Sequence, residues 1–160
     1  MSESTFKVDF IGIGAMKCAT TWIFECLKEH PQICGSKEKE VHFFDENYAK
    51  GLSFYKSFFK HCALEKCKGE FSPKYIFKEE VPARIYEHFP DVKLVASLRD
   101  PVERAYSNYW LHRSKGDRAM LFSFEEAIEK MKEYYIKPGL YYTNLRRYFD
   151  LFPEENVLIL

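Results

Sequence analysis

The sequence predicts an α/β fold in which helices flank a central parallel sheet. Residues 7–13, 93–98 and 157–160 are apolar runs with the length of buried strands, and helical patterns fill the intervals between them. Strands that alternate with helices favour parallel pairing, because each helix returns the chain to the same end of the sheet. The 160 residues are enough for one domain with a hydrophobic core.

The first half of the chain carries three further predicted elements after the first strand. Residues 20–30 form a helix, with apolar side chains at helical spacing and Pro31 just beyond its end. A polar connection spans residues 32–45, where basic and acidic side chains cluster. Residues 53–61 predict a short aromatic helix, and residues 69–71 predict a short strand.

The second half begins with a predicted helix at residues 82–89, which has a proline in its first turn. The next strand then leads into Asp100, Pro101 and Glu103. This order predicts an N-cap, a proline in the first turn and a capping box, for a helix that continues to about residue 113.

The last predicted elements are two helices and a strand. Ser123 and Glu126 form a second capping box, which opens a helix to about residue 134. Residues 140–151 predict another helix before the final apolar run. The sequence has no internal repeat or linker, so we expect a single domain over residues 1–160. Because the final run has the pattern of a central strand, we expect the C-terminal part of this domain to be absent.

The composition is that of an ordinary globular protein. Hydrophobic residues make up 46% and charged residues 30%, and the 24 Lys and Arg balance the 24 Asp and Glu. A net charge of zero argues against a nucleic-acid-binding protein but allows a local cationic pocket. The sequence has no 18-residue apolar stretch, and no basic segment followed by an apolar one opens it. We therefore expect neither a membrane span nor a secretory signal.

The five cysteines are odd in number and include no CxxC pair. Cys62 and Cys67 lie five residues apart, and only His61 is a nearby metal-binding side chain. We therefore expect no metal site, reduced thiols and a cytoplasmic protein. The oligomeric state stays open.

A glycine-containing loop between the first strand and the first helix is the most informative local feature. Gly12 and Gly14 permit a sharp turn and a close approach to a ligand, and Lys17 supplies a positive charge. Thr20 and Thr21 stand where a helix N-terminus presents N–H groups and a favourable dipole to an anion. The alternative interpretation is a plain strand-to-helix turn with a surface lysine.

A second candidate anion site follows the strand at residues 93–98. Arg99 lies at the carboxyl end of that strand, where open parallel sheets bind ligands, and a guanidinium can bind phosphate in a bidentate manner. Ser107 lies one to two turns into the next helix and can reach the same group. The alternative is an Arg99–Asp100 ion pair inside a capped helix start.

Together these segments resemble the sulfotransferases that use 3′-phosphoadenosine 5′-phosphosulfate (PAPS), in particular the heparan-sulfate 3-O/N-sulfotransferase-like group and its bacterial relatives. Residues 14–21, GAMKCATT, resemble the loop that holds the 5′-phosphosulfate, and residues 98–107, LRDPVERAYS, resemble the segment that holds the 3′-phosphate. Residues 37–45, KEKEVHFFD, are close to the K-E-x-H-F-F-D motif of that group. The match continues at residues 48–55, 69–75 and 138–141.

The resemblance implies a P-loop-like three-layer sandwich and transfer of a sulfuryl group from PAPS. The product would be 3′-phosphoadenosine 5′-phosphate (PAP), and no metal is implied. Lys17 would stabilise the bridging and leaving oxygens. The residues implied in donor binding are Gly14, Ala15, Lys17, Cys18, Ala19, Thr20, Thr21, Arg99 and Ser107.

The resemblance also implies a proton acceptor in the segment of residues 37–45. Glu40 matches the glutamate that serves as base in the resembled group, and we favour it over His42, the base type of other sulfotransferase subgroups. The alternative for this charged run is a solvated surface segment. The expected acceptor-binding side chains are Lys39, Asp45, Phe71 and Lys74, and the alternative for His42 and Asp45 is that they orient the acceptor or the base.

The acceptor stays open at this stage. Phe71 stands where carbohydrate 3-O-sulfotransferases commonly carry a lysine, so a glycan, a lipid and a small molecule are all candidate acceptors, through a hydroxyl or an amine. Three alternatives to an active sulfotransferase remain: an inactive PAPS- or PAP-binding fragment, a P-loop kinase-like phosphotransferase and a structural interaction module. The kinase fits poorly, because Met16 stands where a Walker A motif has its glycine before the lysine.

Overall fold

A parallel sheet of five strands forms the centre of the computed structural model, which describes residues 6–63, 66–117 and 121–160. The strand order is β2-β3-β1-β4-β5. The strands span Phe10–Gly14 (β1), Ile33–Gly35 (β2), Cys67–Phe71 (β3), Lys93–Ala96 (β4) and Val157–Ile159 (β5). The predicted α/β fold with a parallel sheet is confirmed. Most of the N-terminal stretch in which we expect no secretory signal, residues 1–5, lies outside the described residues.

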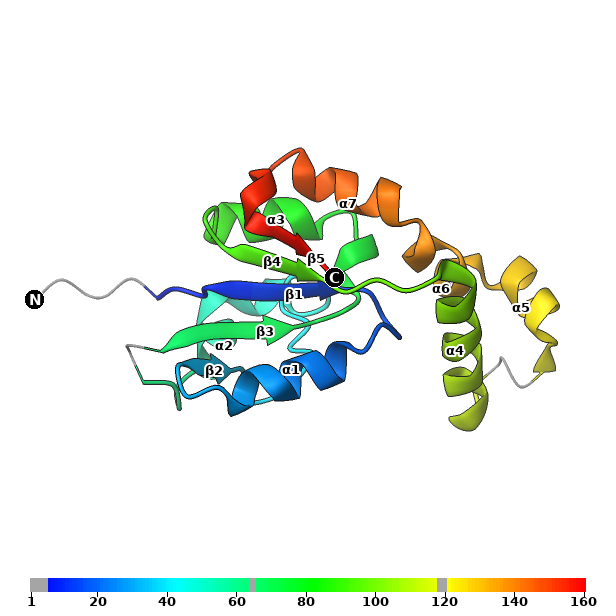
Figure 1. Ribbon diagram of the computed structural model, residues 1–160, viewed down its shortest axis with the longest axis horizontal. Coiled ribbons are helices and arrows are strands. Elements are labelled where there is room, and N and C mark those ends of the chain that lie inside the picture. Colours follow the sequence, from blue (N-terminus) through cyan, green and yellow to red (C-terminus); the bar gives the residue numbers. More distant parts are fainter. Residues whose placement is uncertain (1–5, 64–65, 118–120) are drawn as a thin grey trace, which may run out of the picture.

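Helices cover both faces of the sheet (Figure 1). One face packs against α1 (Thr20–Glu29), and the other packs against α2 (Gly51–Ser57), α3 (Val81–His88) and α7 (Tyr141–Phe149). A separate lobe beyond the carboxyl ends of the strands contains α4 (Pro101–Ser114), α5 (Phe124–Lys130) and α6 (Lys132–Tyr135) (Figure 1). Short 3₁₀ helices lie at Tyr48–Lys50 (η1), Tyr75–Phe77 (η2), Lys137–Gly139 (η4) and Glu154–Asn156 (η5).

Strand β1 forms the centre of the core because its side chains alternate between two buried faces. Ile11 is fully buried in the cluster that also contains residues of α2, α3 and α7. Phe10 points to the other face and packs with Phe24 of α1 and Phe71 of β3. Gly12 shares this face, and a larger residue does not fit there, because a Cβ would lie 2.0 Å from Cδ1 of Phe71.

Two local predictions are wrong. Residues 33–35 are not part of a polar connection but form the edge strand β2, because Ile33 packs into the aromatic cluster under α1 while the backbone pairs with β3. The capping box of Ser123 and Glu126 is confirmed, but its helix ends at Lys130. Met131 has non-helical dihedral angles and packs into the core of the lobe, so the segment continues as a separate helix, α6.

The expectation of reduced thiols is wrong for one pair of cysteines. Cys34 of β2 and Cys62, 28 residues later, form a disulfide. This disulfide was not predicted because the strand β2, which brings Cys34 next to the loop after α2, was not predicted. Cys18, Cys26 and Cys67 are free thiols.

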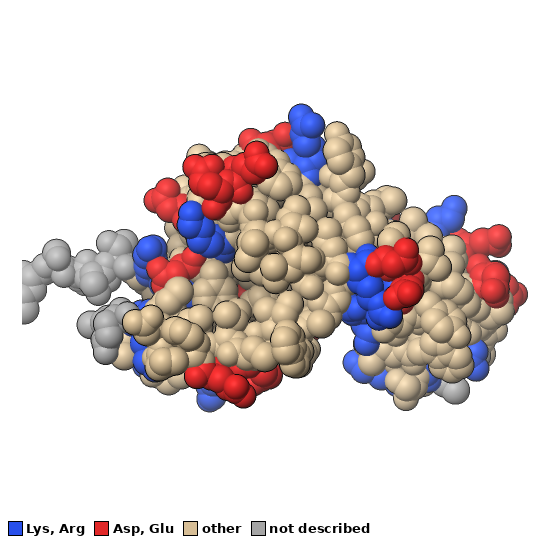
Figure 2. Space-filling model, in the orientation of Figure 1, with Lys and Arg blue, Asp and Glu red and all other residues tan. Residues whose placement is uncertain are grey.

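The surface carries both signs of charge. Lysine, arginine, aspartate and glutamate side chains are scattered over the face shown in Figure 2, and large parts of this face are uncharged. Within the described parts of the chain, no helix combines the length and the apolar character that crossing a bilayer requires.

Candidate active site

The loop between β1 and α1 is held firmly at the carboxyl edge of the sheet. Lys17 and Ala19 have φ values of 68° and 58°, in the left-handed region that residues other than glycine seldom adopt. The Ala15 N–H donates to the Ser97 carbonyl (2.8 Å), and the Ser97 hydroxyl donates to the Cys18 carbonyl (2.7 Å). These bonds tie the loop to the residue that follows β4.

The N-terminus of α1 is open to an anion. Its N-cap is Ala19, which provides no side-chain acceptor for the first N–H groups, and its first turn has no acidic residue. Thr20 is buried and Thr21 is exposed in that turn, and both line a cleft together with Lys17. The residues present therefore fit the phosphosulfate group that the resemblance implies.

Cys18 offers a ligand only its backbone. Its buried thiol donates to the Met16 carbonyl (3.6 Å) and lies 3.9 Å from the Tyr141 hydroxyl. Burial raises the pKa of this thiol, so it is uncharged at neutral pH. The Tyr141 hydroxyl in turn donates to the Arg99 carbonyl (2.9 Å), so Tyr141 lies between the two predicted anion segments.

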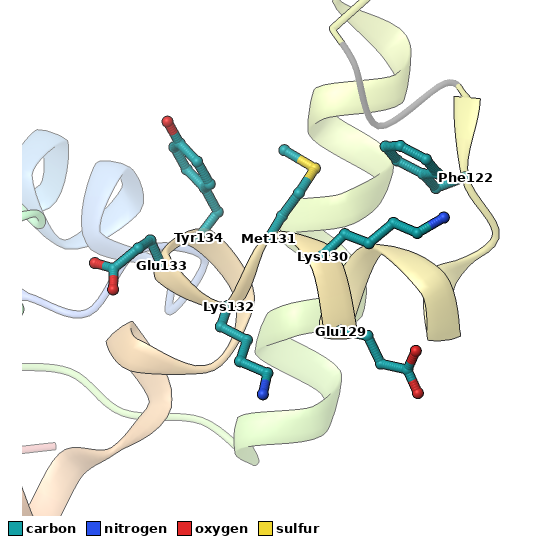
Figure 3. A pocket seen from close by; sticks show the side chains of 7 residues that line it. All are labelled: Phe122, Glu129, Lys130, Met131, Lys132, Glu133 and Tyr134. Carbon is teal, nitrogen blue, oxygen red and sulfur yellow. The ribbon is translucent and has the colours of Figure 1, made fainter.

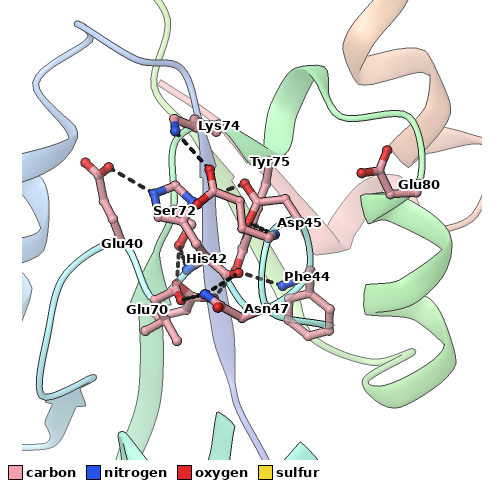
Figure 4. Close-up of polar contacts among 12 residues, drawn as sticks. Glu40, His42, Phe44, Asp45, Asn47, Glu70, Ser72, Lys74, Tyr75 and Glu80 are labelled. Atoms are coloured by element: carbon pink, nitrogen blue, oxygen red, sulfur yellow. Dashed lines mark hydrogen bonds and ion pairs between the residues drawn. The ribbon is translucent and has the colours of Figure 1, made fainter. Parts of the chain in front are cut away.

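The second half of the site is the loop that follows β2. Glu40 and His42 have φ values of 62° and 52°, again in the left-handed region. The His42 ring lies between two carboxylates: Nε2 is 3.4 Å from Oε2 of Glu40, and Nδ1 is 3.0 Å from Oδ2 of Asp45 (Figure 4). Lys39 donates to the other oxygen of Glu40 (2.7 Å).

These contacts fix the charges of the loop. Hydrogen bonds to Asp45 and Glu40 raise the pKa of His42 to about 9, so the imidazole is a cation at neutral pH. The bond to His42, aided by Lys39, lowers the pKa of Glu40 to about 2, so this carboxylate is ionised. Burial acts against both shifts. The side chain of Glu40 is 43% exposed, whereas that of His42 is only 15% exposed.

The structure places two of the expected acceptor contacts, Asp45 and Phe71, away from the cleft. The Asp45 carboxylate is 1% exposed and binds His42 and the Glu46 N–H, so it orients the imidazole and does not face an acceptor. Phe71 is fully buried in the aromatic cluster between the sheet and α1. Its ring packs against Phe10 and Phe24 and is not among the residues that line the cleft.

A cleft of about 530 Å³ joins the two loops. Its walls include the first turn of α1, the lobe helix α4 and the segment after β3. Lys74, in that segment, also donates to Glu46 (3.0 Å). The predicted site residues that line the cleft are Lys17, Ala19, Thr20, Thr21, Glu40 and Lys74.

The α4 wall of the cleft was not predicted. It consists of Asn108, Leu111 and His112 of the helix, Lys115 at its C-cap and Asp117 just beyond it. Burial lowers the pKa of His112 below its usual value; Asp117 acts in the opposite direction, and Lys115 and Lys17 lower the pKa further, so the neutral ring predominates at pH 7. The spacing of three and four residues along α4 is the sequence signal for such a face, since residues so spaced share one side of a helix.

Arg99 and Ser107 are not among the residues that line this cleft. Nε and Nη2 of Arg99 both donate to Oε2 of Glu103 (3.0 and 2.9 Å), so the Arg99–Asp100 pair considered above is not formed. Asp100 is the N-cap of α4, as predicted, while the Glu103 carboxylate binds Arg99 instead of closing a capping box. Ser107 follows Glu103 by one turn, so Ser107 and the guanidinium share one side of α4.

A second hollow, of about 690 Å³, lies on the lobe (Figure 3). It is lined by Phe122 and residues 129–134 and contains no predicted site residue. Two clusters among the described residues have potential metal ligands, namely Cys34 with His61 and Cys62, and His42 with Asp45 and Glu46. The sulfurs of the first cluster are bonded to each other, and His42 in the second is a paired cation.

The fold and the cleft define a class of protein: an α/β protein with a parallel sheet, in which an uncapped helix N-terminus and an ionised carboxylate line one cleft. Comparison of the sequence with known families identifies it further. Residues 7–160 match the sulfotransferase domain family, so the chain belongs to this family.

Two curated proteins and one crystal structure illustrate the relationship. The chain is 38% identical over 130 residues to the membrane-associated sulfotransferase kil1 of Dictyostelium discoideum, covering 76% of the chain and 27% of that protein. It is 33% identical over 154 residues to heparan sulfate glucosamine 3-O-sulfotransferase 5 of Mus musculus, covering 89% of the chain and 44% of that protein. The chain thus spans less than half the length of either relative.

The crystal structure is that of a sulfotransferase from Alicyclobacillus acidocaldarius. It superimposes with a TM-score of 0.88 at 28% sequence identity, over 97% of this chain and 73% of the other. The central sheet and its helices are therefore those of the sulfotransferase fold.

Proposed function

We propose that this chain transfers a sulfuryl group from PAPS to a hydroxyl or an amine of a glycan acceptor. The observation that carries the proposal is the cleft that contains Lys17, the uncapped N-terminus of α1 and the ionised Glu40. The sulfotransferase family implies PAPS as the donor. The relative named as a heparan sulfate glucosamine 3-O-sulfotransferase supports a glycan over a lipid or a small molecule.

The donor brings a sulfuryl group that is already bonded to a good leaving group, the 5′-phosphate of PAP. Backbone N–H groups of residues 16–19 and the hydroxyls of Thr20 and Thr21 would bind its 5′ end, while the N–H of Ala15, also expected to bind the donor, is held by the Ser97 carbonyl. Arg99 and Ser107 would bind its 3′-phosphate, with Arg99 exchanging Glu103 for the phosphate.

Lys17 is the proposed stabiliser of the leaving oxygen. During transfer, a bond forms between sulfur and the acceptor atom, and the bond between sulfur and the phosphate oxygen breaks. Negative charge develops on that oxygen, and a fixed cation next to it lowers the barrier. Cationic side chains provide this neutralisation, so we propose that the reaction needs no metal.

Glu40 is the proposed proton acceptor. It is ionised and partly exposed, whereas His42 already carries its proton and is more buried. The low pKa of Glu40 makes it a weak base, so its position relative to the acceptor must contribute much of the effect. His42 and Asp45 then hold Glu40 in place, and Lys39 and Lys74 are the proposed contacts to sulfate or acceptor.

The compartment is part of this proposal. The cysteine content predicted a cytoplasmic protein, but disulfides persist mainly in oxidising compartments, and Cys34 and Cys62 form one. We therefore propose an oxidising compartment. Alkylation of free thiols in intact cells, followed by mass spectrometry, tests this: a Cys34–Cys62 peptide pair supports it, and two alkylated cysteines contradict it.

A radiolabelled transfer assay tests the function. The chain is incubated with ³⁵S-labelled PAPS, EDTA and a panel of acceptors: N-sulfated heparan oligosaccharides, a simple glycoside and a phenol. Label in the oligosaccharide supports the proposal. Calorimetric binding of PAP without any transfer indicates an inactive binding protein, and the absence of both transfer and PAP binding contradicts the assignment.

A further inference from the structure

We call the loop that follows β2 and carries Glu40 and His42 the base loop. Glu70 is a buried carboxylate next to this loop, and the proposed reaction does not use it. It lies in β3 next to Phe71 but points to the opposite face of the sheet, and it is fully buried. Three hydroxyls donate to it: Ser72 (2.7 Å), Tyr75 (3.0 Å) and Tyr55 (3.3 Å). Burial raises the pKa of Glu70 to about 7, although these hydroxyls act in the other direction.

Two of these hydroxyls also accept a hydrogen bond from the base loop (Figure 4). The His42 N–H donates to Oγ of Ser72 (3.1 Å), and the Phe44 N–H donates to the hydroxyl of Tyr75 (3.2 Å). A hydroxyl has a single hydrogen. When it donates this hydrogen to a carboxylate and accepts a hydrogen bond from an amide, the position of the carboxylate constrains the position of the amide. We call Glu70, Ser72 and Tyr75 the Glu70 relay.

The relay completes the support of a strained loop. The carbonyls of the loop are held from elsewhere: Asn47 donates to the His42 carbonyl (3.1 Å), and Arg84 donates to the Phe44 carbonyl (2.7 Å). The relay holds the amides of the same two residues. The left-handed backbone of His42 persists only where the surroundings determine it from several sides.

We propose that Glu70 is a positioning residue, which sets the place of the Glu40–His42–Asp45 group by anchoring the amides of His42 and Phe44 through Ser72 and Tyr75. This inference rests on the proposed function, since it assumes that Glu40 acts on the acceptor. Tyr55 is a natural control. It donates to the same carboxylate as Tyr75 and lies in the same core, but it links Glu70 to no amide of the loop.

The test compares Ser72→Ala and Tyr75→Phe with the control Tyr55→Phe. Each variant removes one hydroxyl from Glu70. Ser72→Ala and Tyr75→Phe also leave a loop amide unpaired, so we expect them to lose more stability than Tyr55→Phe, and kcat is compared under conditions where all three variants are folded. We expect kcat for sulfate transfer to fall about tenfold or more in Ser72→Ala and Tyr75→Phe, and to stay within about twofold in Tyr55→Phe. The affinity for PAP, measured by calorimetry, stays unchanged in all three, because the loop at Lys17 keeps its contacts.

A second measurement does not depend on activity. Hydrogen exchange followed by NMR should show faster exchange of the His42 amide in Ser72→Ala and of the Phe44 amide in Tyr75→Phe, with neither change in Tyr55→Phe. An equal loss of kcat in all three variants, or unchanged exchange at both amides, overturns the relay. Absence of transfer in the wild-type chain contradicts the proposed function instead, and the exchange data then decide on the relay alone.

Discussion

Among the residues that the structure describes, four other than glycine have left-handed backbone, and these four lie in the candidate site. Lys17 and Ala19 are in the loop between β1 and α1, which we call the anion loop, and Glu40 and His42 are in the base loop. Such a conformation costs about 1 kcal/mol or more for each residue, so it persists only where hydrogen bonds and packing determine it. The side chains proposed to act on donor and acceptor are thus placed by strained backbone in two separate loops at the carboxyl edge of the sheet.

The charge of His42 makes stability depend on pH. Its pKa is about 9 in the folded chain, against 6.5 for the unperturbed group, so its contribution is fully present below pH 6.5 and is lost as the pH rises to about 9. The upper limit is on the order of 3 kcal/mol. Urea unfolding between pH 6 and pH 9.5 should show this decline in the wild-type chain and not in His42→Gln. A parallel decline in both chains contradicts the assigned charge.

The ion pair of Arg99 and Glu103 gives a matched pair of variants. Arg99→Ala should weaken PAP binding about tenfold or more, because a charge-assisted contact to the 3′-phosphate is lost. Glu103→Ala should bind PAP as well as or better than wild type, because Arg99 no longer exchanges a carboxylate for the phosphate. Calorimetry with PAP and with adenosine 5′-phosphate measures both effects. If Arg99→Ala weakens the two nucleotides equally, Arg99 does not bind the 3′-phosphate.

Site residues could be identified from the sequence where a motif specifies both the residue type and its position in the site. Lys17 and Glu40 come from different motifs and line one cleft. Phe71 and Asp45 were misplaced because a motif position does not say on which face of a strand, or how deep, a side chain lies. The Glu70 relay was not predictable, since it depends on two hydroxyls of the segment after β3 meeting the amides of His42 and Phe44, which lie about 30 residues earlier in the chain.

At the scale of elements, the close contact between β1 and β3 is the most sensitive point. Gly12→Ala would place a Cβ against the buried Phe71 ring, so we expect a loss of about 1–3 kcal/mol in the free energy of unfolding. Phe71→Leu relieves the clash, and the double variant should therefore be more stable than the sum of the single losses. Urea unfolding of the four chains measures this coupling, and strict additivity contradicts it.

The bounds of elements with a clear hydrophobic pattern were predicted to within a few residues, as α1, α3 and β4 show. The edge strand β2 has three residues and forms through pairing with β3, which no local pattern reveals. The break at Met131 arises because packing in the lobe overrides helix propensity. The disulfide depended on β2 and was missed with it.

At the scale of the molecule, the site lies where the carboxyl ends of the strands face the α4–α6 lobe (Figure 1). Open parallel sheets bind ligands at this edge, and here β1 and β3 bring the anion loop and Lys74 to one cleft, with α4 as its opposite wall. Fold class, family and the order of the motifs were predictable from the sequence. The α4 wall was not, because it depends on how the lobe packs against the sheet.

The central claim is that Lys17 and Glu40 act on the same transfer from one cleft. The most direct test is the initial rate of ³⁵S transfer from PAPS in Lys17→Ala and Glu40→Gln, each compared with wild type at saturating donor and acceptor. We predict a loss of at least about a hundredfold in both variants, with Glu40→Gln binding PAP as wild type does. A wild-type rate in either variant would contradict the account.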